Sequence, residues 1–508
     1  MSLLSIDMGS SSCKAVAFAI DGRMLAEASR SYSPDIPRPS WAEMSPEVFW
    51  ESFSGVTREI AEHVSDDPVE ALGISSHGET FVAVNGHNEA VCPAILNMDN
   101  RAMAQADWFT ANFDPKQIFE ITGLAIHPMY PIPKILWLRE NKPEIFRSAL
   151  KYLAVPSYLL MRLRLEVCID YTQASRFLAF DVLRKGWSEE ILGTCGLSSD
   201  LLADPVPTGT VAGQIPSSIA RNLGLRDSVV VVIGGHDQPC AALGMGVVDA
   251  GRVSASLGTY ECLLASSDAP SINESAYAAN LNTYCHVVPD RYVTLAYFPS
   301  GIMLDWFVKL FREGVCPNEG SFADLCRILE TQAPTGASGL LVTPHLLGSC
   351  NPDFDPAATG VISGLRPAMG AAHIYKGILE GIGCEFANMA ELLHRVAGPF
   401  RDVYVTGGGC RSQLGLELRA AMSGCYLHRM RGDDAVCLGT AILAGVGAGK
   451  YKDIASAIEQ LVSVADTVEP DLGRAAVYRQ YMKQYRLLYS RLASVRESSS
   501  KSCSQGDQ

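Results

Sequence analysis

The sequence predicts an α/β protein built from two similar halves, and three observations lead to this fold class. Short strands rich in β-branched residues alternate with helical stretches, a pattern typical of sheets covered by helices. Two distant segments, 3–20 and 253–265, each combine a strand, a tight turn at a glycine and a second strand. A chain of 508 residues is too long for one hydrophobic core. We therefore expect one domain at 1–247 and another at 248–490, each beginning with such a hairpin.

The hydrophobic pattern predicts further elements in the first half. Residues 45–64 are amphipathic and predicted to be helical, with Ser45 as the cap and proline in the first turn. Residues 71–75 and 228–233 are short apolar runs that predict buried strands. Between them, residues 99–162 are predicted to be largely helical.

The second half repeats this alternation after its hairpin. A long helix is predicted at 370–396, then a strand at 402–406 that ends in three glycines, and another helix from Ser412. The tail at 491–508 is rich in Ser, Lys and Gln with little to bury, which predicts disorder.

Composition excludes several classes of function. The net charge of −14 argues against a nucleic-acid partner, because no basic stripe is available to replace phosphate counterions. No apolar run is long enough to cross a membrane. The first strand begins by Leu3, which leaves no room for a signal peptide, so we expect a cytoplasmic protein.

The 15 cysteines do not form a recognisable framework. They are scattered singly, without the paired C-x-x-C spacing of a zinc site or a disulfide scaffold. Most lie in apolar runs, so we interpret them as small buried hydrophobic residues in a reducing compartment.

Both hairpin turns carry hydroxyl residues beside glycine. Gly9 is followed by Ser10 and Ser11, and Gly258 is followed by Thr259. Glycine allows the backbone to approach a ligand closely, and hydroxyls with free amides suit phosphate oxygens. Two such turns facing each other would hold a nucleoside triphosphate from both sides. The alternative is a pair of surface hairpins without a ligand.

Two aspartates lie where a predicted buried strand breaks into a glycine-containing turn or a helix. In open α/β sheets, reactive groups gather beyond the carboxyl ends of the strands, which is where Asp7 and Asp237 fall. One carboxylate could hold Mg²⁺ through water, and the other could accept a proton from a substrate hydroxyl. The alternative is that each caps a turn or a helix.

Three other polar or glycine-rich segments follow strands or helices. Residues 76–80 include His77 and Glu79, which could bind a polyhydroxy ligand or could be a solvated loop. Glycines 407–409 resemble a nucleotide-binding turn, although they lack the G-x-G-x-x-G spacing. Residues 445–450 fail as a P-loop because their glycine spacing is wrong, so we interpret them as a helix end.

Taken together, these segments resemble the FGGY carbohydrate kinases over roughly residues 3–450. The most specific match is 129–141, in which Lys134 is followed by Trp137 three places later. A second family pattern is found at 360–380. The resemblance implies two actin-like, ribonuclease-H-like domains with a cleft for ATP and a sugar between them.

The resemblance also implies a role for each matching residue. It implies Asp237 as the catalytic base and Asp7 as the carboxylate associated with Mg²⁺. The implied substrate-binding residues are His77, Glu79, Asp237 and Gln238. The implied ATP-binding residues are Gly9, Ser10, Ser11, Lys14, Gly258, Thr259, Gly408 and Gly409, with Lys14 near the γ-phosphate.

The implied reaction is in-line phosphoryl transfer from ATP, with Mg²⁺, to a hydroxyl of a small sugar or polyol. The resemblance also suggests a homodimer. The layout at 93–101 resembles xylulokinases, whereas Glu79, Thr80 and the Asp237–Gln238 pair resemble glycerol kinases. Gly78 stands where glycerol kinases have arginine, so we expect extra space and a substrate larger than glycerol. A pentulose such as xylulose therefore ranks above glycerol and other polyols.

Two other classes of function are considered. One is a catalytically silent regulator that binds sugar and nucleotide, but a silent protein has no reason to keep Asp7, Lys14, Asp237 and Thr259 together. The other is an actin-like ATPase or chaperone, which the pattern at 129–141 argues against.

Overall fold

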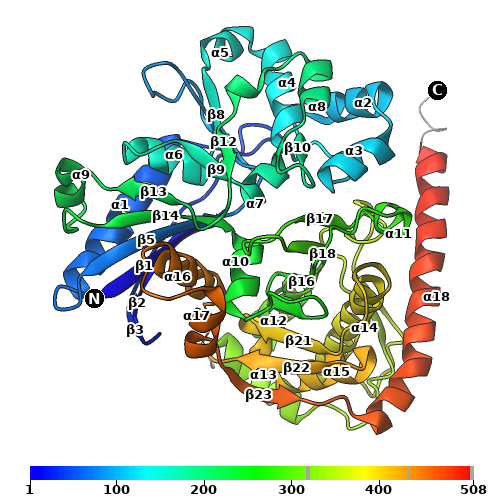
Figure 1. Ribbon diagram of the computed structural model, residues 1–508. Helices are drawn as coiled ribbons and strands as arrows, with labels where there is room; N and C mark the ends of the chain where they lie inside the picture. The colour runs from blue at the N-terminus through cyan, green and yellow to red at the C-terminus, as the bar shows by residue number, and fades with distance from the viewer. Residues whose placement is uncertain (316–320, 433, 504–508) are drawn as a thin grey trace.

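The computed structural model describes residues 1–315, 321–432 and 434–503 (Figure 1). Two mixed sheets, one of six strands and one of seven, organise the fold. The six-stranded sheet contains, in spatial order, β13 (Val211–Gln214), β14 (Val230–His236), β5 (Val69–Ser76), β1 (Ser2–Met8), β2 (Ser12–Ala19) and β3 (Met24–Ser31). The seven-stranded sheet contains β17 (Asn282–Cys285), β18 (Tyr292–Pro299), β16 (Tyr260–Ser267), β15 (Val253–Leu257), β21 (Asp402–Thr406), β22 (Tyr426–Met430) and β23 (Val464–Val468).

The first half carries its helices around the six-stranded sheet and a smaller sheet above it in Figure 1. The helices are α1 (Pro46–His63), α2 (Met103–Asn112), α3 (Pro115–Thr122), α4 (Pro131–Asn141), α5 (Pro143–Ser148), α6 (Val155–Arg162), α7 (Tyr171–Ala174), α8 (Glu189–Cys195), α9 (Ser217–Asn222) and α10 (Asp237–Gly244). The shorter strands are β4 (Glu43–Met44), β6 (Phe81–Val84), β7 (Ala94–Ile95), β8 (Lys151–Ala154), β9 (Cys168–Asp170), β10 (Phe180–Asp181), β11 (Gly186–Trp187) and β12 (Asp204–Val206).

The second half has longer helices. They are α11 (Glu274–Ala278), α12 (Gly301–Val315), α13 (Phe322–Thr331), α14 (Ala371–Ala397), α15 (Gln413–Ser423), α16 (Ala435–Gly447), α17 (Ile454–Leu461) and α18 (Leu472–Cys503). The two remaining strands, β19 (Leu341–Thr343) and β20 (Val361–Ser363), pair with each other.

The two large sheets share one topology. In the first, β1, β2 and β3 are antiparallel neighbours, and β5 and β14 continue the sheet parallel to β1. In the second, β15, β16 and β18 are antiparallel, and β21 and β22 continue parallel to β15. This repetition confirms the predicted α/β fold class, two ribonuclease-H-like units each led by a hairpin.

Local sequence explains most of these elements. Helix α1 buries Phe49, Phe53, Val56 and Ile60, an i, i+4, i+7 and i+11 stripe that packs against β2 and β3. The helix begins at the predicted proline, although the Ser45 side chain makes no capping hydrogen bond. Strands β1 and β5 are almost entirely buried, as their apolar runs predict.

Helix α16 joins the two halves. Although it follows β22 in the chain, it packs on β1, β5 and β14 of the first sheet and crosses α10 (Figure 1). Glycines make this crossing close, since a Cβ on Gly244 would lie 1.9 Å from Ala435 O and one on Gly439 would lie 1.9 Å from Cys240 O. The domain boundaries at 1–247 and 248–490 stay a prediction. Helix α16, which belongs to the second predicted domain, packs on the sheet of the first.

The tail at 491–508, for which disorder is predicted, is helical as far as Cys503 in the structure, and its disorder stays a prediction. Helix α18 continues to Cys503, in a stretch with several good helix formers, such as Leu492, Ala493 and Glu497. Residues 504–508 lie outside the described residues. Within the described part of the chain, we find no helix that combines the length and apolar character needed to cross a membrane.

Candidate active site

Three parallel strands of the first sheet end side by side. Met8 of β1 is in register with Ser76 of β5, and Ser76 is in register with His236 of β14. The turn after β1, the loop after β5 and the start of α10 therefore meet at one edge of the sheet. This arrangement brings Asp7, the 77–80 loop and Asp237 together, as their positions at strand ends predicted.

The two predicted glycine turns of the second sheet also meet. Strands β15 and β21 run parallel, with Ser256 opposite Thr406, so their following turns are neighbours. A Cβ on Gly409 would lie 2.8 Å from Leu257 Cβ, directly before Gly258. Gly258 and Thr259 are exposed, as is Gly408. Their exposed backbone suits a phosphate group or nucleotide.

Helix α10 connects the two groups of residues. It starts at Asp237, at the end of β14, and contacts β15 and β16 of the second sheet. Ser256 Oγ donates to Gln238 Oε1 at 3.4 Å. Asp237 therefore lies between the strand ends of the first sheet and the hairpin that carries Gly258.

Asp237 is the most strongly perturbed carboxyl of this group. Burial, the negative charge of Asp7 and that of Glu79 together raise its pKa to about 8. Its side chain is 23% exposed, and His236 Nε2 lies 3.3 Å from Oδ1. Burial lowers the pKa of His236 to about 3, so this neighbour is neutral. A carboxylate of raised basicity at a strand end is suited to accepting a proton.

Asp7 has a similar but milder environment. Burial raises its pKa to about 6, assisted by the carboxylate of Asp434 and opposed by the Ser75 hydrogen bond and by Lys14. Ser75 Oγ donates to Asp7 Oδ1 at 3.0 Å. In the adjoining turn, Gly9 N donates to Ser12 O at 2.9 Å. Ser10 and Ser11 lie within this turn, so Asp7 and the predicted phosphate turn form one local unit.

Lys14 faces two carboxylates. Its Nζ lies 2.9 Å from Glu27 Oε1 and 2.5 Å from Asp434 Oδ2. Burial lowers its pKa, but Asp434 and Glu27 raise it more, so Lys14 stays charged. The predicted γ-phosphate lysine is thus also a link between β2 and the start of α16.

His77 is buried and fully engaged with the protein. Its Nδ1 must donate to Met8 O, a carbonyl, at 2.7 Å, so its Nε2 accepts from Thr80 Oγ1 at 2.8 Å. Asn97 N donates in turn to Thr80 Oγ1 at 3.0 Å. Burial lowers the pKa of His77, which preserves this neutral arrangement. His77 stays a predicted substrate ligand, and its contacts favour a role in positioning the loop.

Glu79 lies at the centre of a tight turn. Thr80 N donates to Gly78 O at 2.9 Å, and Glu79 has a φ of 61°, a left-handed conformation that non-glycine residues seldom adopt. Lys134 Nζ donates to Leu96 O at 2.6 Å and to Glu79 O at 3.4 Å. Burial lowers the pKa of Lys134 to about 7. The lysine of the 129–141 pattern therefore supports the loop that presents Glu79.

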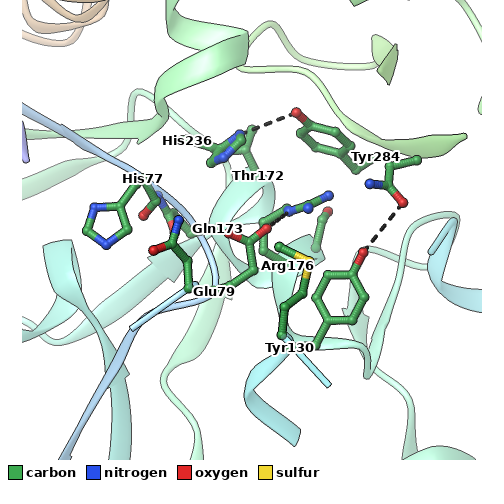
Figure 2. A network of polar contacts seen from close by, with 12 residues as sticks. His77, Glu79, Tyr130, Thr172, Gln173, Arg176, His236 and Tyr284 are labelled. Atoms are coloured by element: carbon green, nitrogen blue, oxygen red, sulfur yellow. Dashed lines mark hydrogen bonds and ion pairs between the residues drawn. The ribbon is translucent and has the colours of Figure 1, made fainter. Parts of the chain in front are cut away.

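The expectation of extra space at Gly78 is wrong. A Cβ at this position would lie 3.0 Å from Arg176 Cγ and 3.1 Å from His236 Cδ2. Arg176 Nε donates to Glu79 Oε1 at 2.5 Å, so an arginine from elsewhere in the chain occupies this region (Figure 2). No local motif marks Arg176, although the arginine missing at Gly78 was a signal to look for another.

Sequence reasoning also missed the aromatic residues around Arg176. Its guanidinium carbon lies 5.4 Å from the ring centroid of Tyr130 and 5.0 Å from that of Tyr284. Tyr130 O–H donates to Asn282 Oδ1 at 3.4 Å, and Tyr284 O–H lies 3.3 Å from His236 Nδ1 (Figure 2). Since Asn282 and Tyr284 belong to β17, this network joins the first half to the second sheet.

Comparison with known proteins assigns the family. Residues 2–244 match the N-terminal domain of the FGGY family of carbohydrate kinases, and residues 253–448 match its C-terminal domain. The chain belongs to the FGGY family of carbohydrate kinases. The enzyme is therefore a carbohydrate kinase, as the sequence resemblance implied.

Relatives and solved structures match this carbohydrate kinase along nearly its whole length. A xylulose kinase of Escherichia coli (strain K12) is 30% identical over 494 residues, which cover 96% of this chain and 99% of that protein. A gluconokinase of Bacillus subtilis (strain 168) is 26% identical over 94% of both chains. A xyloylose kinase structure from Brucella ovis superposes with a TM-score of 0.88 at 23% identity, covering 97% of this chain and 100% of that chain.

Proposed function

We propose that this carbohydrate kinase transfers the γ-phosphoryl group of ATP to a hydroxyl of a pentulose, with xylulose as the first candidate. The observation that carries the proposal is the position of Asp237, a partly exposed carboxyl of raised pKa at the point where the two halves meet. The xylulose kinase among its relatives supports xylulose as the acceptor.

Asp237 would accept the proton of the attacking hydroxyl. Phosphoryl transfer needs little covalent chemistry from the protein, so positioning and charge neutralisation provide most of the catalysis. Gln238 lies next to the base and would help to orient the sugar. Glu79, held in its tight turn, would bind another part of the sugar.

The glycine turns would hold ATP. The turn at Gly9, Ser10 and Ser11 and the turn at Gly258 and Thr259 present backbone amides and hydroxyls that suit phosphate oxygens. Gly408 and Gly409, beside the second turn, would lie on the adenine-nucleotide side. Lys14 would balance charge near the γ-phosphate once ATP displaces part of its contact with Asp434.

The residues present fit a magnesium ion bound mainly through water. The described residues hold no group of three or more His, Cys, Asp or Glu side chains able to bind a metal by themselves. Mg²⁺ typically keeps several waters and uses one or two carboxylates together with substrate phosphates, which Asp7 could supply. When bound, the ion would neutralise charge on the transferring phosphoryl group.

Gluconate is the alternative acceptor that a relative suggests, since a gluconokinase is 26% identical to this chain. Glycerol and other polyols are a further alternative. A silent regulator is disfavoured because the chain keeps Asp7, Lys14, Asp237 and Thr259 together. The predicted homodimer and the cytoplasmic location stay predictions.

The test is coupled ADP release with about twenty ketoses, aldoses, aldonates and polyols. The proposal expects turnover that depends on a sugar, with the highest kcat/KM for a pentulose. Turnover without any sugar would indicate an ATPase, and nucleotide binding without turnover would indicate a regulator.

A further inference from the structure

A buried arginine lies at the predicted sugar end of the site. Arg176 comes from the 3-10 helix at Ser175–Phe177, which follows α7, and its side chain is only 4% exposed. Glu79 binds its Nε, and the rings of Tyr130 and Tyr284 lie near its guanidinium (Figure 2). A guanidinium held on several sides is pre-organised, so little conformational entropy is lost when it binds a further group.

The Nη1 amino group of Arg176 is unused within the part of the chain that the structure describes. This nitrogen is buried and has no hydrogen-bond partner among the residues that the structure describes. Buried polar groups are nearly always paired, and leaving one unpaired is costly. An unused guanidinium nitrogen at the edge of a substrate site therefore indicates a ligand that supplies an acceptor.

Asp237 has a buried acceptor atom without a donor. Its Oδ1 is also buried and has no hydrogen-bond partner in the described part of the chain, although His236 Nε2 lies 3.3 Å away. Gly78 contacts Arg176 and His236, the residue before Asp237, because a Cβ added there would be 3.0 Å from Arg176 Cγ and 3.1 Å from His236 Cδ2. Gly78 thus lies beside Arg176, whose Nη1 lacks an acceptor, and beside the neighbour of Asp237, whose Oδ1 lacks a donor.

Two adjacent hydroxyls of a ligand would satisfy both atoms. One hydroxyl oxygen would accept from Arg176 Nη1, and another hydroxyl would donate to Asp237 Oδ1. The surrounding charge favours a neutral ligand, because Glu79 already neutralises Arg176, and an anion would be repelled by Asp7 and by the ionised form of Asp237. An anionic sugar would bring its carboxylate close to these side chains.

We propose that Arg176 is a specificity-determining residue that donates from Nη1 to a hydroxyl of a neutral polyhydroxy substrate, next to the hydroxyl that faces Asp237. This inference rests on the proposed function and deepens it. It assigns to Arg176 the guanidinium that Gly78 cannot provide, and it favours neutral ketoses and polyols over aldonates.

Steady-state kinetics on Arg176→Met and Arg176→Lys test the proposal. The probes are D-xylulose and its monodeoxy analogues, with glycerol and gluconate for comparison. We expect Arg176→Met to raise the KM for D-xylulose by about ten- to hundredfold, while the KM for ATP stays within about twofold. Arg176→Lys keeps the charge but lacks the planar fork, so it should recover only part of the loss.

The deoxy analogues give a second, independent readout. A site built to bind a hydroxyl rejects the analogue that lacks it, because the site's own polar group is then left unpaired. Wild type should therefore discriminate against one deoxy analogue, and Arg176→Met should lose most of that discrimination. A purely structural role of Arg176 would leave the discrimination unchanged.

Arg419→Lys is the matched control. Arg419 is also a buried arginine, paired with Glu261, but its Nε, Nη1 and Nη2 all have partners. The Arg419→Lys variant should lose about as much thermal stability as Arg176→Lys, but it should keep the wild-type KM for the sugar.

The outcomes separate the two claims. If wild type phosphorylates no sugar, the proposed function fails and this inference fails with it. If wild type phosphorylates D-xylulose and Arg176→Met keeps both the KM and the discrimination, only the inference about Arg176 fails. A preference for gluconate over neutral sugars would overturn the assigned substrate class.

Discussion

Lys14 Nζ lies 2.5 Å from Asp434 Oδ2, which ties strand β2 of the first sheet to the start of helix α16. Asp434 also caps α16, because its side chain accepts from Cys437 N at 3.1 Å. The predicted phosphate-binding lysine is therefore part of the connection between the two halves. Binding of ATP and the contact between the halves would share this side chain.

Replacing Lys14 should affect both stability and ATP binding. We expect Lys14→Met to lower the free energy of unfolding by about 1 kcal/mol, because Asp434 loses its partner. The KM for ATP should rise about tenfold or more through the loss of a charged contact to phosphate. Urea unfolding and steady-state kinetics measure the two effects.

Asp434→Asn is the control for this variant. It breaks the same ion pair but leaves Lys14, and asparagine can still cap α16. The stability loss should resemble that of Lys14→Met while the KM for ATP stays near wild type. Equal ATP KM values for Lys14→Met and wild type would leave Lys14 with a structural role only.

The close crossing of α10 and α16 should not tolerate a methyl group. We expect Gly439→Ala to destabilise the protein by about 3 kcal/mol, because its Cβ would lie 1.9 Å from Cys240 O. Gly193→Ala in α8 is the matched control, since nothing lies within 4 Å of its Cβ position. That change should be neutral or stabilise by about 0.5 kcal/mol. A similar urea midpoint for both variants would contradict the packing described here.

Asp237 should make the ligand-free enzyme less stable as pH rises. Its pKa of about 8 in the folded protein lies above the value in the unfolded chain. Between these two pKa values, Asp237 is protonated in the folded state and ionised in the unfolded state. Stability should fall from about pH 4 to pH 8, and Asp237→Asn should remove that fall. Since 23% of the side chain is exposed, we expect the free energy of unfolding of Asp237→Asn to exceed that of wild type by only about 1 to 3 kcal/mol at pH 8.

Unfolding of wild type and Asp237→Asn at acidic and alkaline pH measures this difference. Contributions from other groups cancel between the two proteins. A stability gap that does not widen with pH would show that Asp237 has an ordinary pKa in the folded protein.

Catalysis should show the opposite dependence on pH. The base must be deprotonated to accept a proton, so kcat/KM for the sugar should rise with pH up to about the pKa of Asp237. Ionisation of His77 should not add a second rise to the pH profile of kcat/KM, because burial lowers the pKa of His77 and keeps it neutral. A pH profile of kcat/KM with saturating ATP checks this, and a flat profile would argue against an ionising base.

Local signals account for what the sequence predicted correctly. The hairpins at 3–20 and 253–265 follow from strand runs around a glycine turn, and the matching order of the two sheets confirms them. The positions of Asp7 and Asp237 at one sheet edge follow from the rule for strand ends, once the strands are recognised.

Long-range packing accounts for what the sequence did not show. Arg176 is distant in the chain from Glu79, and no spacing rule relates the two residues. For the same reason, the sequence predicts open space at Gly78, whereas Arg176 and His236 fill this space in the folded protein. The packing of α16 on the first sheet likewise depends on glycines in α10 and α16 that meet only in the folded protein.

The most direct test of the account is sugar-dependent ADP release by Asp237→Asn beside wild type, with the sugar Kd measured on both proteins. Removal of a general base should reduce kcat by about 10²- to 10⁴-fold, while the sugar Kd stays within about threefold. Sugar-dependent turnover by Asp237→Asn at the wild-type rate would contradict the assignment of Asp237 as the base, and with it the proposed mechanism.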